Sequence, residues 1–257
     1  MITRTNLNDM RETGRLGNQM WAIASTIGIA KRNMTDYSFL EWVYQPWFKN
    51  RLPNSYDINY YLRSRKFRLY TEISPYYQEV NLDNNYAWDL RGYFQSYKYF
   101  DEYKDIIKHY FTFNFETNDN SKDLVAIHVR RGDYLHLSNI HPNLTKEYYQ
   151  KAMELFPNDM FLIFSDDVPW VMDCDWFDHD RCVFKVFEED ATNLPAPYDL
   201  LHMSYMSKCK SFIVANSSFS WWAAYLSDSQ DKVIVAPKTW VLNEDRDDRV
   251  PPDWIRL

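Results

Sequence analysis

Cysteine, long apolar runs and basic charge are all scarce in this sequence, and each scarcity excludes a class of protein. The three cysteines, Cys174, Cys182 and Cys209, are an odd number without a CxxC pair, so we expect reduced thiols in a cytoplasmic protein rather than a disulfide framework. No segment reaches the roughly 20 apolar residues needed to cross a bilayer, and no apolar signal core stands at the beginning. We therefore expect a soluble protein without a transmembrane segment.

The net charge of −7 and the sequence pI near 5.4 argue against a broad basic face. Nothing would attract a polyanion over a wide surface, so a nucleic-acid binder is disfavoured, including one that stacks single strands on aromatic rings. The sequence also contains no G-x-G-x-x-G and no Walker A segment. NAD enzymes and P-loop kinases lose support for that reason, while a local basic pocket remains compatible with the composition.

The composition is that of a globular chain, with 46% hydrophobic and 25% charged residues. Its 257 residues suffice for one large domain or two modest ones. Aromatic residues are abundant, at 18%. Such rings can serve as platforms for sugars or bases, but we expect most of them to fill the core and surface.

The segment LVAIHVRRGDYL, residues 124–135, is an apolar run that ends in concentrated charge. A run of this length is typical of a strand covered on both faces, as in a parallel sheet. Arg130 and Arg131 follow directly, and Gly132 lets the backbone turn before Asp133. Two guanidiniums at the carboxyl end of a strand suit bidentate binding of a phosphate or carboxylate. A salt-bridged strand terminus and a chance RGD adhesion tripeptide are the alternative interpretations.

Strands and helices alternate through the rest of the second half, which predicts a doubly wound α/β fold. We expect strands at 124–129, 161–164, 183–187, 212–215 and 233–236, with helices near 146–156, 198–208 and 218–226. Right-handed crossovers would bring the residues after each strand to one edge of the sheet, beside the two arginines. Those polar or turn residues are 165–167, 188–190, 216–218 and 237–238.

The first half is less regular. Residues 1–13 predict no regular element, and residues 37–86 predict short helices and loops. Between them, Gly14 and Gly17 open a turn into a run with helical spacing. The N–H groups of that helix N-terminus could face an anion or a sugar hydroxyl, and a tight turn into a core helix fits equally well. The polar stretch 114–123 is interpreted as a linker, which predicts an N-terminal half at 1–120 and a C-terminal half at 121–257.

Several segments, taken together, resemble glycosyltransferase family 11, the α-1,2-fucosyltransferases. HVRRGD is shared with other fucosyltransferases, whereas NSSFSWW is narrower. The family's usual GGLGNQ stands here as GRLGNQ, and we expect no counterpart of the membrane anchor of animal members. The segments are GRLGNQMW (14–21), GYFQSYKYF (92–100), VAIHVRRGDYL (125–135), FLIFSDDVPW (161–170) and YDLLHMSYMSKCKSFIVANSSFSWW (198–222).

The resemblance implies a GT-B-like arrangement of two Rossmann-type halves, with GDP-L-fucose bound mainly by the C-terminal half. It implies inverting transfer to the 2-hydroxyl of a terminal galactose-like residue, without an obligatory metal and with the glycan acceptor on the N-terminal side. GDP-L-fucose would be a co-substrate, and no further cofactor is expected. A cytoplasmic protein of this kind could also lie peripheral to a membrane that carries a lipid-linked glycan acceptor.

The implied site combines these segments. Arg130 would stabilise the departing pyrophosphate, and Arg131 would assist it or pair with Asp133. Asp133 is the candidate base for the acceptor hydroxyl, with a phosphate oxygen of the leaving group as the alternative. The donor-binding candidates are His128, Arg131, Asp166, Asp167, Asn216, Ser217, Ser218, Phe219 and Ser220, and the candidate phosphate or acceptor loop contains Gly14, Gly17, Asn18 and Gln19.

Three of these assignments leave a choice. Asp167 could instead cap the following helix, and at least one of Trp221 and Trp222 is expected in the core. The stretches Asp173-Cys174-Asp175 and Asp178-His179-Asp180 resemble a D-x-D metal motif. Neither follows a convincing strand, so we interpret both as acidic loop residues. As a whole, a non-catalytic glycan- or nucleotide-binding protein on the same scaffold is the alternative to an enzyme.

Overall fold

The computed structural model describes residues 1–54, 63, 66–117, 121–185, 194–244 and 248–257. The chain forms two compact units. One contains Met1–Asn114 and Asp248–Pro251, and the other contains Phe115–Asp247 and Pro252–Leu257. The first division falls within the stretch interpreted as a linker, and four residues near the end of the chain belong with the first unit.

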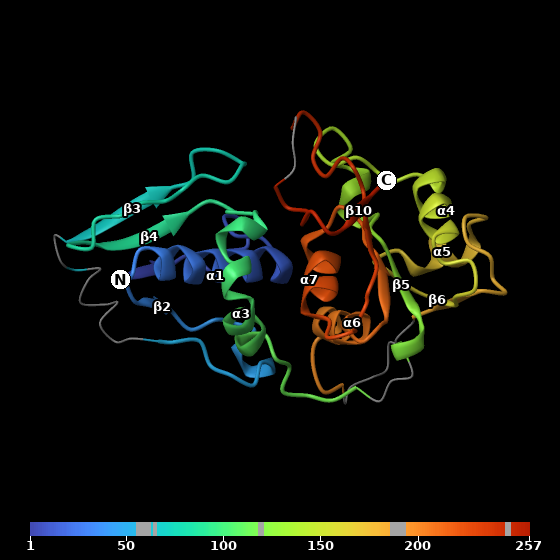
Figure 1. Cartoon of the computed structure of the whole chain (residues 1–257), viewed down its shortest axis with the longest axis horizontal. Coiled ribbons are helices and arrows are strands. Elements are labelled where there is room, and N and C mark those ends of the chain that lie inside the picture. The colour runs from blue at the N-terminus through green and yellow to red at the C-terminus, as the bar shows by residue number, and fades with distance from the viewer. Residues whose placement is uncertain (55–62, 64–65, 118–120, 186–193, 245–247) are drawn as a thin grey trace. The chain divides into compact units, whose positions relative to one another are not determined.

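The second unit contains a six-stranded sheet whose pairings are all parallel among the residues described (Figure 1). Five strands match predicted ones, which confirms the doubly wound α/β fold; the unexpected strand is the two-residue β10. In spatial order the strands are β10 (Ile255–Arg256), β9 (Ile234–Ala236), β8 (Ser211–Ile213), β5 (Val125–Val129), β6 (Phe161–Ser165) and β7 (Cys182–Phe184).

Helices cover both faces of this sheet. Figure 1 shows α4 (Lys146–Glu154) on one side of the strands and α6 (Tyr198–Ser207) with α7 (Ser218–Leu226) on the other. The short α5 (Val168–Asp173) follows β6 and contributes Val171 to the core beside α4. Short 3₁₀ turns lie at Ser121–Asp123 and Gly132–Leu135, before and after β5.

The side chains of β5 alternate between these two layers, as the period of two in a strand requires. Val125, Ile127 and Val129 belong to the core that α4 covers. His128 faces the opposite layer, where its ring lies 5.4 Å from that of Phe219 in α7. All five residues of β5 are buried, so this strand holds its last residues rigidly at the carboxyl edge of the sheet.

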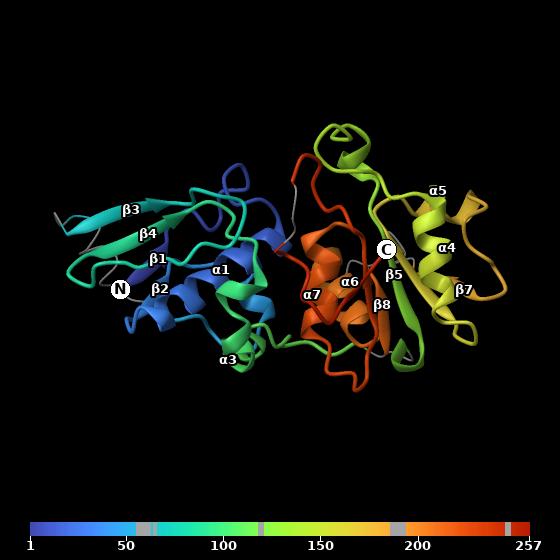
Figure 2. The ribbon, with the colours of Figure 1, turned by 45° about the horizontal axis from the view of Figure 1, so that its top comes forward.

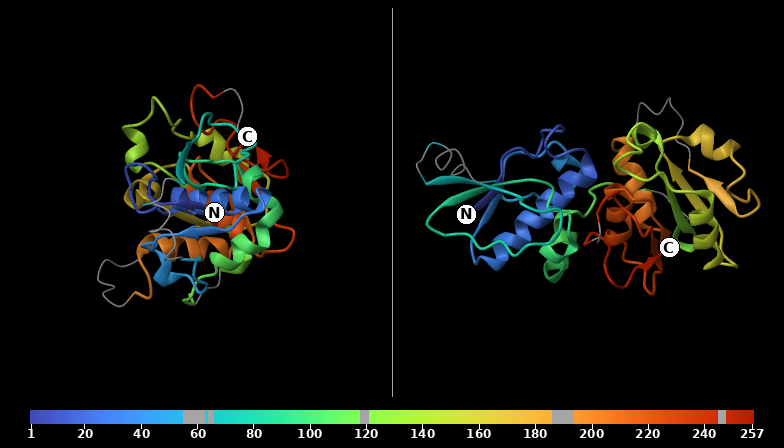
Figure 3. Two further views of the ribbon diagram at one scale, coloured as in Figure 1. Left: turned by 90° about the vertical axis from the view of Figure 1, so that its left-hand side faces the viewer. Right: turned by 90° about the horizontal axis from the view of Figure 1, so that it is seen from above.

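The first unit contains a second parallel sheet, whose four strands are labelled in Figure 2. Their spatial order is β2 (Tyr37–Phe39), β1 (Ile2–Arg4), β4 (Ala87–Arg91) and β3 (Phe67–Thr71). The helix α1 (Leu16–Arg32) packs against β1 and β2, and Figure 3 shows this blue helix alongside the strands. The unit also contains α3 (Lys104–Tyr110) and 3₁₀ turns at Gln45–Trp47, Tyr97–Tyr99 and Asp101–Tyr103.

The prediction of no element in residues 1–13 was wrong, because β1 forms the centre of this sheet. Its polar residues Thr3 and Arg4 are fully buried. The Arg4 guanidinium donates to the carbonyls of Leu90, in β4, and Gly92, just after it, at 2.9 and 2.6 Å. A charged residue that is satisfied by distant carbonyls gives no apolar signal in the sequence, so this strand escapes a pattern search.

The prediction of only short helices and loops in residues 37–86 was also wrong, because β2 and β3 lie there. β2 is three residues long, and β3 is an edge strand whose five residues all remain partly or fully exposed. Neither strand shows the buried run or the strict alternation that identifies a strand in a sequence. With β1 and β4 they nevertheless complete the second parallel sheet, as expected for two Rossmann-type halves.

The motif GYFQSYKYF contacts residues 248–251, the segment near the end of the chain that belongs to the first unit. Lys98 Nζ lies 2.6 Å from an Asp248 carboxylate oxygen, and the Ser96 hydroxyl donates to the Asp248 carbonyl at 3.0 Å. Arg249 Nε donates to Gln95 Oε1 at 3.3 Å. These contacts explain why residues 248–251 belong to the first unit and give this motif a structural task.

Candidate active site

Arg130 leaves the end of β5 and is held between two carboxylates. Its Nη2 donates to Asp133 Oδ1 at 2.6 Å, and its Nη1 lies 2.8 Å from Asp166 Oδ2. The guanidinium carbon is 5.3 Å from the centre of the Tyr134 ring. Nε is buried and has no acceptor among the residues that the structure describes. Arg130 is therefore oriented before any ligand binds, with one donor unsatisfied.

Arg131 is held by a different set of groups. Its Nε donates to Asp167 Oδ2 at 3.1 Å, and its guanidinium carbon lies 3.5 Å from the centre of the Trp170 ring. Its backbone N–H donates to Asp166 Oδ1 at 2.8 Å. The predicted pairing of Arg131 with Asp133 is therefore replaced, because the chain turn at Gly132 presents Asp133 to Arg130 instead.

Asp166 connects the two arginines and needs a glycine beside it. A Cβ at Gly132 would lie 2.4 Å from Asp166 Oδ2, a distance that real Cβ contacts do not show. Any side chain at position 132 would therefore push away the carboxylate that holds Arg130 and the Arg131 backbone. The glycine of RRGD therefore allows the Asp166 carboxylate to lie close to the backbone at position 132.

Asp167 has two structural tasks, one of them predicted and the other, its contact with Arg131, not predicted. Its Oδ1 accepts from the backbone N–H of Trp170 at 3.4 Å, so it caps α5 as the alternative interpretation held. Its other oxygen accepts from Arg131. The backbone N–H of Asp167 donates to the Ser165 hydroxyl at 2.9 Å, which fixes the turn after β6.

His128 lies beneath Arg130 and is neutral. It is 5% exposed, and its Nδ1 has no hydrogen-bond partner among the described residues. Burial, followed by the charges of Arg130 and His202, lowers the pKa of His128 to about 3. A neutral imidazole can accept or donate one hydrogen bond, but it cannot supply positive charge to a phosphate near neutral pH.

Asn216 is predicted to contact the donor, and the structure uses its amide to fix two loops. Its Nδ2 donates to the carbonyls of Pro142 and Trp240 at 3.0 and 3.2 Å. The backbone carbonyl of Asn216 accepts a hydrogen bond from the Tyr134 hydroxyl at 2.9 Å. This bond connects the turn after β5 to the turn after β8. Asn216 is 1% exposed, so its Nδ2 positions loops around the site.

The serines that follow differ in their surroundings. Ser220 is fully buried, and its hydroxyl donates within the chain to the carbonyls of Ala215 and Ser217. Ser217 precedes α7 without a side-chain cap on the helix, and Ser218 and Phe219 are half-buried in its first turn. Ser217 is buried at 7% exposure, so Ser218 and Phe219 are the members of this segment with partial access to solvent. Trp221 and Trp222 are both fully buried, so both are core residues.

In the first unit, Gly14 has a φ of 77°, which favours glycine, and the turn leads directly into α1. Gln19 is 1% exposed, and its Nε2 donates to the Gly14 carbonyl at 2.9 Å. Its Oε1 accepts from Trp42 Nε1 at 2.8 Å. Gln19 therefore closes a tight turn onto a core helix, which was one of the two interpretations of this loop.

The other two residues of the loop lie in the first turn of α1. Gly17 is buried. Asn18 is half-buried, and its Oδ1 accepts from Gln95 Nε2 at 2.9 Å. Asn18 is thus the member of this loop with both a polar side chain and access to solvent.

Sequence reasoning missed the two aromatic residues that position the arginines. Tyr134 and Trp170 both stand in segments quoted for the family resemblance, but neither was assigned a task. Their spacing from the arginines carries no recognisable signal, because each meets its partner through a turn rather than along a helix or strand. The predicted turn at residues 188–190 lies outside the described residues.

The D-x-D stretches are engaged otherwise. Asp175 lies 2.7 Å from Lys146 Nζ, and the Asp178 side chain accepts from the Asp180 backbone N–H at 3.0 Å. Across the ranges described, no group of three or more His, Cys, Asp or Glu side chains is arranged to hold a metal ion. Within those same ranges, no helix has the length and apolarity to cross a membrane.

Two parallel α/β units, one with paired arginines at its strand ends, are typical of glycosyltransferases with a GT-B-like fold. Comparison with known families confirms this class: Glycosyl transferase family 11 matches residues 1–257, and the chain belongs to that family. The resemblance of its motifs is thereby confirmed.

Several relatives are 24–30% identical to this chain over the aligned residues. The O-antigen biosynthesis glycosyltransferase WbnK of Escherichia coli is 30% identical over 70% of this chain and 63% of its own length. An α-1,2-colitosyltransferase of Escherichia coli is 30% identical over 72% and 68%. Galactoside 2-α-L-fucosyltransferase SEC1 of Bos taurus is 24% identical over 88% and 66%. The chain thus spans about two thirds of each relative.

Among solved structures, the fucosyltransferase NodZ from Bradyrhizobium superposes with a TM-score of 0.51. The alignment covers 87% of this chain and 92% of NodZ, with 14% sequence identity. At that identity the likeness concerns the fold, and it agrees with the predicted fold class.

Proposed function

We propose that this protein transfers L-fucose from GDP-β-L-fucose to the 2-hydroxyl of a terminal galactose-like residue, with inversion to an α-1,2 link. The observation that carries the proposal is the preoriented pair Arg130 and Arg131 at the carboxyl end of β5. Membership of family 11 and relatives named for α-1,2 transfer support the choice of sugar and linkage.

The chemistry requires charge stabilisation of the departing GDP. When the bond between the sugar carbon and the phosphate oxygen breaks, negative charge grows on the pyrophosphate, and positioned guanidiniums lower the energy of that state. Arg130 supplies one fixed positive charge, because its Nη atoms are held by Asp133 and Asp166. Arg131, whose guanidinium carbon lies over the Trp170 ring, adds a second fixed positive charge.

The acceptor hydroxyl must lose a proton as the new bond forms. Asp133 is the candidate base: its side chain is 41% exposed, and one of its oxygens has no hydrogen bond from the described residues. A phosphate oxygen of the leaving GDP is the alternative. Asp133→Asn distinguishes them, because loss of a base lowers kcat about 10²-fold or more, whereas phosphate-assisted transfer retains most turnover.

Proton transfer to Asp133 and proton transfer to a phosphate oxygen both proceed without a metal ion. We propose a metal-independent transfer, in which guanidinium and backbone donors meet the charge that a cation meets in other sites.

The decisive experiment is release of GDP from GDP-fucose in the presence of a galactoside panel, followed by linkage analysis of the product. A fucosyl product linked α-1,2 supports the proposal. Because a colitosyltransferase is 30% identical, the corresponding colitosyl donor is tested in parallel. Preference for that donor would move the assignment to colitosyl transfer at the same site.

A non-catalytic glycan- or nucleotide-binding protein is the second candidate, since a fold does not guarantee turnover. The carboxylate pairing of both arginines in the ligand-free structure is what favours it, because a purely structural ion-pair network has the same appearance. Binding of GDP-fucose without GDP release from any acceptor mixture would establish it.

A further inference from the structure

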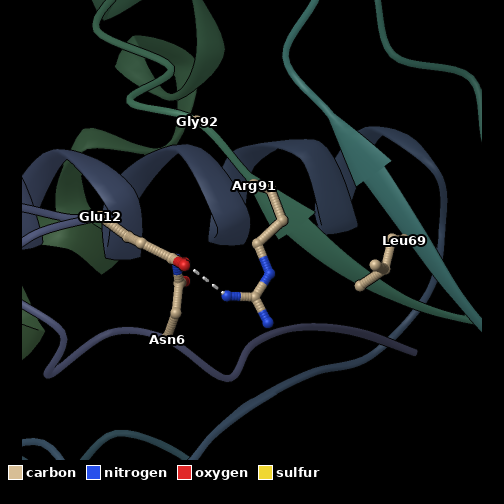
Figure 4. Close-up of a pocket in the computed structure, with 5 residues that line it drawn as sticks. All are labelled: Asn6, Glu12, Leu69, Arg91 and Gly92. Atoms are coloured by element: carbon tan, nitrogen blue, oxygen red, sulfur yellow. Dashed lines mark hydrogen bonds and ion pairs between the residues drawn. The ribbon is translucent and has the colours of Figure 1, made fainter.

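An open groove lies at the carboxyl ends of the strands in the first unit (Figure 4). Its lining residues come from the loop after β1, from β3 and from the end of β4: Asn6, Glu12, Leu69, Arg91 and Gly92. Its volume is about 510 Å³, within the range of small-molecule sites. Ligands of open parallel sheets bind at this edge, so the position and the size both suit a small ligand.

Arg91 is fixed on one wall of the groove. Its Nη1 lies 2.9 Å from Glu12 Oε2, as the dashed line in Figure 4 shows. Its Nη2 donates to the Thr5 hydroxyl at 2.9 Å and to Asp89 Oδ2 at 2.7 Å. Nε has no acceptor among the described residues. The side chain is therefore immobile and retains one donor.

Glu12 presents an acceptor to the groove, and Asn6 helps to hold it. Glu12 Oε2 accepts hydrogen bonds from Asn6 Nδ2, at 2.7 Å, and from Arg91. Glu12 Oε1 accepts none from the described residues. Because the Asn6 amide nitrogen must face this carboxylate, its oxygen is directed elsewhere. Asn6 Oδ1 is buried without a hydrogen-bond partner in the described part of the chain. A ligand hydroxyl could donate to Glu12 Oε1, whose side chain is 55% exposed, whereas the buried Asn6 Oδ1 is closed to a ligand.

The charges of the groove select a neutral ligand. Arg91 is paired with Glu12 and Asp89, and Arg4 and Glu72 lie close enough to act on the same groups, so acidic groups outnumber basic ones by three to two. An anionic ligand would be repelled, and a cation would find Glu12 already paired. Among the described residues that line the groove, Leu69 on the edge strand β3 adds an apolar side chain that is 60% exposed. Fixed polar groups beside an apolar side chain suit the hydroxyls and the C–H face of a neutral sugar.

We propose that this groove binds a neutral hexose unit of the acceptor glycan, with Glu12 and Arg91 as its specificity-determining residues. The inference rests on the proposed function, because it supplies an acceptor site for that reaction. It names the class of acceptor: neutral, with hydroxyls that donate to Glu12, rather than a sialylated or uronic sugar at this position.

The test is initial-rate kinetics of the full chain with GDP-fucose and lactose, on Glu12→Ala and Glu12→Gln. Loss of a hydrogen bond to a charged group raises the KM for lactose about tenfold or more in Glu12→Ala. The turnover number and the KM for GDP-fucose stay within about twofold of the parent, because the donor is not bound here. Glu12→Gln keeps one oxygen acceptor and gives an intermediate KM.

Glu79→Ala is the matched control, since Glu79 is an exposed acid of the same unit outside the groove. It leaves every constant unchanged. An unaltered KM for lactose in Glu12→Ala overturns the proposal, and so does an equal loss for donor and acceptor, which would indicate a general structural defect.

Direct titration of lactose separates this proposal from the proposed function. If the parent transfers nothing to any acceptor, the function fails, yet lactose binding that weakens about tenfold in Glu12→Ala still supports a sugar groove. Equal lactose binding by parent and variant, or none by the parent, overturns the groove even when transfer is observed.

Discussion

Arg130 Nη1 lies 2.8 Å from Asp166 Oδ2, although the two residues belong to different strand ends. The parallel register of β5 and β6 produces this contact: Val129 stands opposite Ser165, so the next residue on each strand leaves the sheet at the same point. The ion pair joins the HVRRGD motif to the SDD motif. Arg130 of the first motif therefore depends on Asp166 of the second for its orientation.

Arg130→Lys tests whether this guanidinium acts on the reaction. The change keeps the charge but removes the planar fork, so we expect kcat to fall on the order of 10²- to 10³-fold. The side chain is 17% exposed and paired with partly exposed carboxylates, so the melting temperature should stay within a few degrees of the parent. Turnover and thermal unfolding are measured on the same preparations.

Arg131→Lys is the companion variant. We expect a milder effect on turnover, because Arg131 is held by Asp167 and the Trp170 ring. A large fall in melting temperature for Arg130→Lys, with normal turnover per folded molecule, would instead make Arg130 a structural ion-pair member.

Nucleotide binding should depend on the second phosphate. GDP should raise the melting temperature markedly more than GMP at the same concentration, because a ligand that binds only the native state stabilises it by mass action. Differential scanning fluorimetry with both nucleotides measures this, and the gap between them should shrink in Arg130→Lys. Equal shifts from GMP and GDP would show that the arginines do not contact the β-phosphate.

Asn216→Ala should weaken the fold. The amide donates to two carbonyls at a buried position, and leaving such groups unsatisfied costs about 1–3 kcal/mol. Thermal and urea unfolding should both report the loss, and the exposed Asn139 provides the matched control in Asn139→Ala. If Asn216→Ala kept the stability of the parent but lost affinity for GDP-fucose, Asn216 would be a donor-binding residue instead.

Stability should fall in mild acid because of buried histidines. Burial lowers the pKa of His128 to about 3 and that of His202 to about 4, from 6.5 when unfolded. The unfolded chain therefore takes up protons below pH 6.5 while the folded chain does not. Each histidine's contribution is complete above pH 6.5 and decreases by about 1.4 kcal/mol per pH unit below it, down to its folded pKa.

His128→Gln should accordingly flatten the dependence of melting temperature on pH between 6.5 and 4, whatever its effect at neutral pH. His136→Gln, at an exposed position, should retain the slope of the parent. An unchanged slope in His128→Gln would mean that this imidazole is protonated in the folded state.

Activity should survive an excess of EDTA, because the site meets phosphate charge with arginines and one aspartate of each D-x-D stretch is engaged in another contact. Assays before and after chelation measure this. Complete loss that Mn²⁺ or Mg²⁺ restores would assign a metal to the reaction.

The second unit could be predicted from sequence because its strands are buried on both faces. Such strands read as continuous apolar runs with turn residues after them, and β5, β6, β8 and β9 all follow that rule. The first unit could not be predicted in this way. Its central strand β1 buries Thr3 and Arg4, whose polarity hides the strand until the carbonyls of β4 are in place.

The sequence by itself determined the fold of the second unit, the arginine pair at a strand end and the family. Only the tertiary structure decided how those residues are used: Asp133 pairs with Arg130, Asn216 holds two loops, and Glu12 meets Arg91 across the first unit. Periodicity and motifs record which residues are buried and where strands end, since these depend on near neighbours in the chain. Hydrogen-bond partners depend on which turns meet in space, and that is fixed when the sheets assemble.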